Sequence, residues 1–228
     1  MDVQALLLTL RLAAVTTLIL LAISLPLAWW LARSTSRVRP AVEALSALPL
    51  LLPPTVLGFY LLVMLGPETA FGRMLITVLG HPLAFTFSGL VVGSVLYSFP
   101  FAVQPLVAGF RAVNTTALED AAMLGATPAQ VFRRVALPMA RPALITATVL
   151  AFMHTVGEFG VVLMLGGNIP GATRTISIAL YDSVQEFDYA SANHTALLLM
   201  VFSFLALLAI YIQPNAWRRS AKTGGRLV

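Results

Sequence analysis

Apolar residues in this chain do not alternate with polar ones but run together in long blocks that carry almost no charge. A helix needs about 20 apolar residues to cross a bilayer core about 30 Å thick, and several blocks reach that length. The pattern therefore predicts five membrane-spanning helices, at about residues 5–31, 42–65, 85–110, 143–165 and 195–212. We expect an all-α membrane protein with one transmembrane domain over residues 1–228.

Composition supports this prediction, since 59% of the residues are hydrophobic and only 10% are charged. Those values exclude an ordinary water-exposed protein surface. A signal peptide is the alternative for the first block, but its apolar run is too long, and Asp2 precedes it in place of a basic cluster. We expect this block to remain as a span. The chain has no cysteine, which excludes disulfides and thiol chemistry.

The formal net charge of +5 comes from basic residues that gather on one side of the predicted spans. Only Arg73 and Arg174 lie in the opposite loops, and Arg11 lies inside the first span near its start. By the positive-inside rule the N-terminus is outside and the C-terminus is cytoplasmic. Charge here indicates topology, and no nucleic-acid partner is expected. The residues on the cytoplasmic side are Arg33, Arg37, Arg39, Arg111, Arg133, Arg134, Arg141, Arg218, Arg219, Lys222 and Arg226.

The loop at 111–142 is the largest predicted cytoplasmic piece, and its local signals predict two short helices joined at a glycine. Thr116 and Glu119 are spaced as a capping box, so the first helix should begin at Thr116. Gly125 can adopt the left-handed conformation that ends it. The second helix has its own N-cap, first-position proline and capping box, at Thr127, Pro128 and Gln130. Further stops are expected at Pro138 and Pro142.

A short alanine-containing helix on an otherwise small cytoplasmic surface predicts a knob that docks into a partner protein. The spacing of the loop also resembles the EAA loop of ABC-importer permeases, E-A-A-x3-G-x9-I-x-L-P. Asp120 stands where that family prefers alanine and Val135 where it prefers isoleucine, without a change in spacing. The matching residues are Glu119, Ala121, Gly125 and Leu137-Pro138.

The resemblance implies a small type I ABC importer permease fold, in which this loop forms a coupling helix that inserts into an ATPase subunit. By resemblance the contact spans residues 117–129, with Glu119, Asp120, Ala121, Gly125, Ala126 and Pro128 as contact residues. For Glu119, helix capping alone is the alternative role.

Two further stretches, Leu48–Leu62 and Gly157–Asp182, look like those of molybdate permeases. The implied function is ATP-driven import of molybdate, with tungstate or sulfate as alternatives. The implied assembly has two copies of this chain, two cytoplasmic ATPase subunits and an extracytoplasmic molybdate-binding protein, in a bacterial inner membrane.

No catalytic, cofactor or metal site is expected in the chain itself. It has no G-x-x-x-x-G-K-[ST] loop to hold nucleotide phosphates, so hydrolysis is expected in the separate ATPase. It also has no H-E-x-x-H motif and no serine-centred nucleophile elbow, and its three histidines lack metal-ligand spacing. An ion-coupled secondary transporter remains the rival, although a single acid within the spans offers little for ion coupling.

The transport pathway should offer weak, distributed hydrogen-bond donors, because buried arginines would trap an oxyanion. Glu158 is the acid within the fourth predicted span, and His154 lies one turn before it. An unpaired charge there is costly, so we expect Glu158 to pair with His154 or an arginine and to position an outer gate without binding the anion. The polar candidates, each also explicable as a hydrogen bond between helices, are Thr55, Ser94, Ser98, Gln104 and Thr155. We single out Thr55, Ser98, His154 and Glu158.

Overall fold

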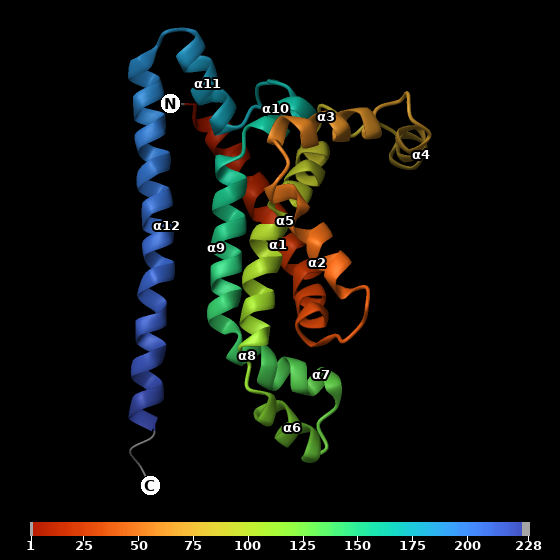
Figure 1. The fold of residues 1–228 in the computed structure, drawn as a ribbon. Coiled ribbons are helices and arrows are strands. Elements are labelled where there is room, and N and C mark those ends of the chain that lie inside the picture. Colours follow the sequence, from red (N-terminus) through yellow and green to blue (C-terminus); the bar gives the residue numbers. More distant parts are fainter. Residues whose placement is uncertain (1, 225–228) are drawn as a thin grey trace.

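The computed structural model describes residues 2–224 and, within them, every regular element is a helix (Figure 1). The elements are α1 (Val3–Arg33), α2 (Arg39–Ala47), η1 (Leu48–Leu50), α3 (Pro54–Leu65), α4 (Ala70–Leu79), α5 (Phe87–Arg111), α6 (Thr115–Met123), α7 (Pro128–Val131), the π-helix η2 (Phe132–Ala136), α8 (Leu137–Met139), α9 (Arg141–Gly157), α10 (Gly160–Gly166), α11 (Ile176–Gln185) and α12 (Tyr189–Gly224). The expected all-α fold class is confirmed.

Three described helices, α1, α5 and α12, are long and apolar enough to cross a membrane, and the number reaches five if two bent helix pairs each count as a span. The predicted span at 42–65 falls on one such pair. The helical segment Arg39–Leu50, which comprises α2 and η1, meets α3 at 106°. Pro49, Pro53 and Pro54 lie at this bend, where each removes a backbone donor. The segment predicted as the second span is therefore sharply bent in the structure.

The predicted span at 143–165 is also interrupted. Helix α9 ends at Gly157, the chain is extended at Glu158, and α10 begins at Gly160. Helix α10 packs on α3 and α5, whereas α9 packs on α1 and α5. The break therefore lets one segment contact two different parts of the bundle.

The core of the molecule lies where α1, α5 and α9 pack side by side (Figure 1). Small residues permit the close approach of these helices, since a Cβ at Gly109 would collide with the side chain of Ala143. Leu20, Ala102 and Ala151, one from each helix, are fully buried at the centre. Helix α12 runs along the outside of this bundle, and few of its described side chains are buried.

Helices α6 and α7 lie at one end of the bundle, opposite α10 and α11 (Figure 1). Helix α6 begins at Thr115, and its N-cap is Asn114, whose Oδ1 accepts from the Thr116 N–H at 2.9 Å. The predicted capping box of Thr116 with Glu119 is therefore wrong, because Thr116 already lies inside the helix. Asn114, two residues earlier, satisfies the Thr116 N–H and so begins the helix before the predicted cap.

The turn between α6 and α7 agrees with the sequence. Gly125 has a φ of +83°, and its N–H donates to the Ala122 carbonyl at 2.9 Å. The Thr127 N–H donates to Gln130 Oε1 at 2.8 Å, and the Gln130 N–H donates to Thr127 Oγ1 at 3.4 Å. The left-handed glycine and the second capping box are both confirmed.

Helix continues through Pro138, where a stop was predicted. The preceding turn widens into the π-helix η2, in which the Leu137 N–H donates to the Phe132 carbonyl. A wider turn accommodates a proline ring that an α-helical turn would not. The helix ends instead at Ala140, where the chain bends by 73° into α9.

Candidate functional site

The α6–α7 loop places the predicted contact residues on an open surface. Glu119 and Asp120 are exposed on α6, and Ala121 is half-buried. Gly125 and Pro128 are exposed at the turn, with Ala126 half-buried between them. The six residues thus share one lobe, α6 to the start of α7.

Two apolar side chains at the tip of this lobe lie inside the predicted contact range 117–129 but were not among the residues singled out there. Met123 is 79% exposed and Leu124 is 88% exposed, although both are large hydrophobic residues. They lie just before Gly125, so the turn holds them away from the bundle. Such exposure beside charged residues is typical of a surface that a partner covers. Their place in the sequence gave a signal, because they lie between the motif residues Ala121 and Gly125, directly before the predicted turn.

The loop rests on a base formed by the adjoining ends of α1 and α5. Arg33 donates to the Phe110 carbonyl at 3.3 Å and to the Val113 carbonyl at 3.1 Å. These bonds satisfy carbonyls at the end of α5, where a cation is also favourable for the helix dipole. The Arg33 guanidinium lies 5.3 Å from the Trp29 ring centroid, which fixes it further.

An aromatic cluster completes this base and joins three segments. Trp29 of α1 lies 5.4 Å from Phe110 of α5 and 5.4 Å from Phe132 of η2, centroid to centroid. Phe110 and Phe132 are 5.8 Å apart. Edge-to-face contacts of this kind add to the free energy gained from burial. The cluster therefore packs the loop directly against α1 and α5.

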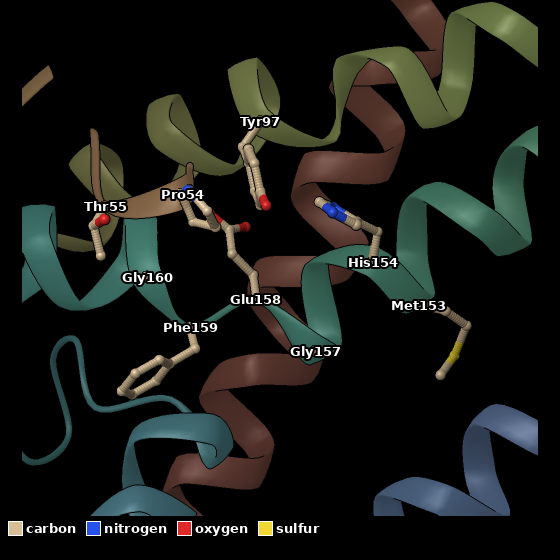
Figure 2. Close-up of a pocket in the computed structure, with 9 residues that line it drawn as sticks. All are labelled: Pro54, Thr55, Tyr97, Met153, His154, Gly157, Glu158, Phe159 and Gly160. Carbon is tan, nitrogen blue, oxygen red and sulfur yellow. The ribbon is translucent and has the colours of Figure 1, made fainter. Parts of the chain in front are cut away.

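A second region lies at the break between α9 and α10, where a cavity of about 430 Å³ opens around Glu158 (Figure 2). Glu158 has φ −67° and ψ 133°, so it caps the end of α9. The sequence had suggested instead that it lies within a membrane-spanning helix. The side chains of Glu158 and Tyr97 point toward one another across the cavity (Figure 2). The lining residues are Pro54, Thr55, Tyr97, Met153, His154, Gly157, Glu158, Phe159 and Gly160.

The carboxylate of Glu158 is the most unusual group in this cavity. Its residue is only 3% exposed, and neither oxygen has a hydrogen-bond or ion-pair partner within the described part of the chain. The buried hydroxyl of Ser94 also lacks a partner there. A buried carboxylate without a partner is costly, which sets this position apart from the packed core.

His154 is engaged elsewhere. Its Nδ1 lies 2.9 Å from Ser98 Oγ, and its ring stacks on Phe101 with the centroids 3.8 Å apart. Ser98 Oγ also lies 3.0 Å from Thr155 Oγ1. The predicted pairing of Glu158 with His154 is therefore not formed, because the imidazole is held by α5.

Three of the four singled-out pathway residues, Thr55, His154 and Glu158, line the same cavity. Ser98 does not line the cavity, but its hydroxyl contacts the imidazole of His154, which does. Tyr97 was missed, although a tyrosine within an apolar span and next to Ser98 offered a signal. The arrangement combines hydroxyl and imidazole groups with one acid. Among the described residues no group of three acidic or histidine side chains is placed to hold a metal ion.

The chain was compared with known protein families and curated proteins. Residues 8–218 match the family profile described as binding-protein-dependent transport system inner membrane component. The molybdenum transport system permease protein ModB of Azotobacter vinelandii is 52% identical over 92% of this chain and 93% of that protein. The ModB protein of Escherichia coli K12 is 34% identical, over 98% and 96% of the two chains. The sulfate transport system permease protein CysT of Salmonella typhimurium is 33% identical, over 81% and 66%.

Solved structures give the same fold. A chain of the MetNI methionine ABC transporter in an inward-facing conformation superposes with a TM-score of 0.69, and the match covers 94% of both chains at 21% identity. A chain of the bacterial alginate ABC transporter superposes with a TM-score of 0.71 and covers 96% of this chain and 79% of its own, at 20% identity. The architecture is therefore that of a type I importer permease.

Proposed function

This chain belongs to the family of binding-protein-dependent transport system inner membrane components, and we propose that it is the permease subunit of an ATP-driven molybdate importer. The observation that carries the proposal is 52% identity, over nearly the full length, to a molybdenum transport permease. A sulfate permease is 33% identical, over a smaller share of the chain, which favours molybdate over sulfate.

The assembly we propose contains two copies of this chain, two ATPase subunits and a separate molybdate-binding protein. The α6–α7 lobe is the contact with the ATPase, with Leu124 and Met123 as the apolar anchors and Glu119 and Asp120 at their side. Apolar anchors with a polar margin suit a groove on a folded partner. The Trp29 cluster then transmits the movement of the lobe to α1 and α5.

The membrane orientation we propose places the α6–α7 lobe in the bacterial cytoplasm and the N-terminus outside. It rests on the basic residues around the lobe, of which Arg111, Arg133 and Arg134 are exposed. In this orientation the Glu158 cavity lies toward the outer side of the membrane.

We further propose that the Glu158 cavity belongs to the outer gate of the pathway. Thr55 and Tyr97 offer hydroxyl groups, which bind an oxyanion weakly enough to release it. Glu158 itself would repel an anion, so its role is to set the conformation of the break. A cavity of this size with several polar groups accommodates water, which would satisfy the carboxylate in the open state.

The experiment that tests the proposed function is ATP hydrolysis by the complex reconstituted in lipid with its own binding protein. We expect molybdate-loaded binding protein to stimulate hydrolysis more than tungstate- or sulfate-loaded binding protein does. Stronger stimulation by sulfate or tungstate would reassign the substrate. Uptake driven by an ion gradient without nucleotide would favour the secondary transporter and end the proposal.

A further inference from the structure

A second cavity, of about 490 Å³, shares no lining residue with the Glu158 cavity. The N-terminal end of α1, which contributes to it, lies at the end of the bundle opposite the α6–α7 lobe (Figure 1). The walls of the cavity come from the first turns of α1, the entry into α5 and the loop before α11. It combines two long polar side chains with large apolar ones. The lining residues are Gln4, Leu7, Leu8, Arg11, Phe85, Thr86, Phe87, Gly171 and Ala172.

Arg11 is the charged group in this cavity. It lies on the membrane-spanning helix α1, is exposed, and has its guanidinium carbon 4.8 Å from the centroid of the Phe87 ring. Within residues 2–224 no carboxylate pairs with it, whereas Arg111 is paired with Glu43 and Arg174 with Asp182. An arginine in an apolar span requires an anion or water nearby. Arg11 is thus a cation that this chain leaves available.

Gln4 provides a second polar group two helical turns earlier on the same helix. Seven residues correspond to about 10 Å along a helix, and Leu7 lies between the two polar side chains. Gly171, with a φ of +74°, lets the Gln4 amide approach closely, since a Cβ there would lie 2.6 Å from Gln4 Nε2. The Gln4 amide therefore packs against Gly171 at the rim of the cavity.

Phe85 shows that the wall is held in an unfavourable conformation. Its φ is +61°, a region that bulky residues rarely occupy, and its side chain stays 51% exposed. Its N–H donates to the Leu165 carbonyl of α10 at 2.9 Å, which fixes this backbone. Strain of this kind gathers at binding sites and switch regions. Here it sets the Phe85 ring in the wall of the cavity that Arg11 also lines.

We propose that this cavity binds the headgroup of an anionic phospholipid. The phosphate lies on Arg11 and within reach of Gln4, over Leu7, and an acyl chain continues past Arg11 toward the bilayer centre along the exposed Leu18 of α1. A free tetrahedral oxyanion would satisfy Arg11 but would leave the apolar wall exposed to water. A lipid satisfies both, because it carries a phosphate and an apolar chain and already surrounds α1.

The proposal is tested by the thermal stability of the full permease complex, purified in detergent with its companion subunits and titrated with lipid. We expect phosphatidylglycerol to raise the melting temperature saturably and phosphatidylcholine to raise it less. Arg11→Gln should weaken the apparent affinity for phosphatidylglycerol by about tenfold or more, the effect of losing one charge-assisted hydrogen bond. Arg11→Lys should retain most of it.

Arg73→Gln is the matched control, because Arg73 is exposed on α4 near the same end of the bundle but donates only to backbone carbonyls. The Arg73→Gln complex should show the same apparent affinity for phosphatidylglycerol as the unsubstituted complex. Equal phosphatidylglycerol affinity in Arg11→Gln would overturn the proposal. So would stabilisation by inorganic phosphate alone that depends on Arg11, which would assign the cavity to a free anion. Loss of the dimer in Arg11→Gln with unchanged lipid response would assign Arg11 to a contact with the second copy.

Discussion

The base of the α6–α7 lobe and the break at Glu158 are built in opposite ways. At the base, Arg33 and Trp29 make hydrogen bonds and aromatic contacts that join three segments. At the break, a helix is interrupted and the Glu158 carboxylate lacks a partner within the described residues. The first region has one well-determined packing. The second has a buried carboxyl group that makes no hydrogen bond within the described residues.

This difference indicates that the two regions have different roles in a conformational change. A region that transmits a partner's motion must be stiff, whereas a region that opens must have more than one packing of similar free energy. We therefore assign transmission to the Trp29 cluster and movement to the Glu158 cavity. The expected outcomes below separate these roles.

The largest effect is expected at the tip of the lobe. Leu124→Asp should abolish co-purification of the ATPase, because it places a charge in the centre of an apolar contact. Leu124 is almost fully exposed, so the fold of the permease itself should be unaffected. Leu124→Met keeps an apolar side chain and serves as the control. If the ATPase still co-purifies with Leu124→Asp, the lobe is not the contact.

The next effect concerns the base. Trp29→Ala removes the centre of the aromatic cluster and should lower the free energy of unfolding by about 2–4 kcal/mol, measured by denaturation in detergent. Trp30→Ala is the neighbouring control, since Trp30 is exposed and makes none of these aromatic contacts. Trp29→Ala should also weaken coupling, so that less substrate is taken up for each ATP hydrolysed. Equal loss of stability in the two variants would deny the cluster its role.

At the Glu158 break, a change of function without a change of assembly is expected. Glu158→Gln keeps the shape of the side chain and removes its charge, so the ATPase should still associate while uptake changes by several-fold. Glu186→Gln, at the exposed end of α11, is the control and should transport normally. Unchanged uptake and unchanged ATPase coupling in Glu158→Gln would remove the gate assignment.

The smallest effect is expected at the ion pairs near the N-terminus. Arg174 lies 3.5 Å from Asp2 and 3.0 Å from Asp182, and all three side chains are partly exposed. Such pairs contribute about 0–1 kcal/mol each. Arg174→Gln should therefore lower the melting temperature only slightly, and less at high salt than at low salt. A large loss would mean that Arg174 has a further role.

The sequence predicts the loop well because its signals are local. Gly125, Thr127 and Gln130 act on backbone groups three or fewer residues away, so their spacing determines the turn. The first helix start was misplaced because the capping-box spacing of Thr116 and Glu119 was given more weight than the stronger N-cap preference of asparagine at Asn114.

The break at Glu158 was not predicted from the sequence, because it depends on tertiary packing. Gly157 and Gly160 flank it and offered a signal, but glycines are frequent in membrane helices for packing alone. A Cβ at Gly160 would lie 2.7 Å from Pro54 Cβ, so Gly160 allows α10 to approach α3 closely just after the break. The position of Tyr97 opposite Glu158 follows from the same packing.

The most direct test of this division uses the absence of cysteine from the chain. Single cysteines at Thr55, in the cavity, and at Ala136, buried at the base, are labelled with a membrane-impermeant thiol reagent in the reconstituted complex. We predict that nucleotide changes the labelling rate at Thr55→Cys and leaves Ala136→Cys protected in every state. The opposite result, with nucleotide exposing Ala136→Cys while Thr55→Cys stays constant, would contradict the account.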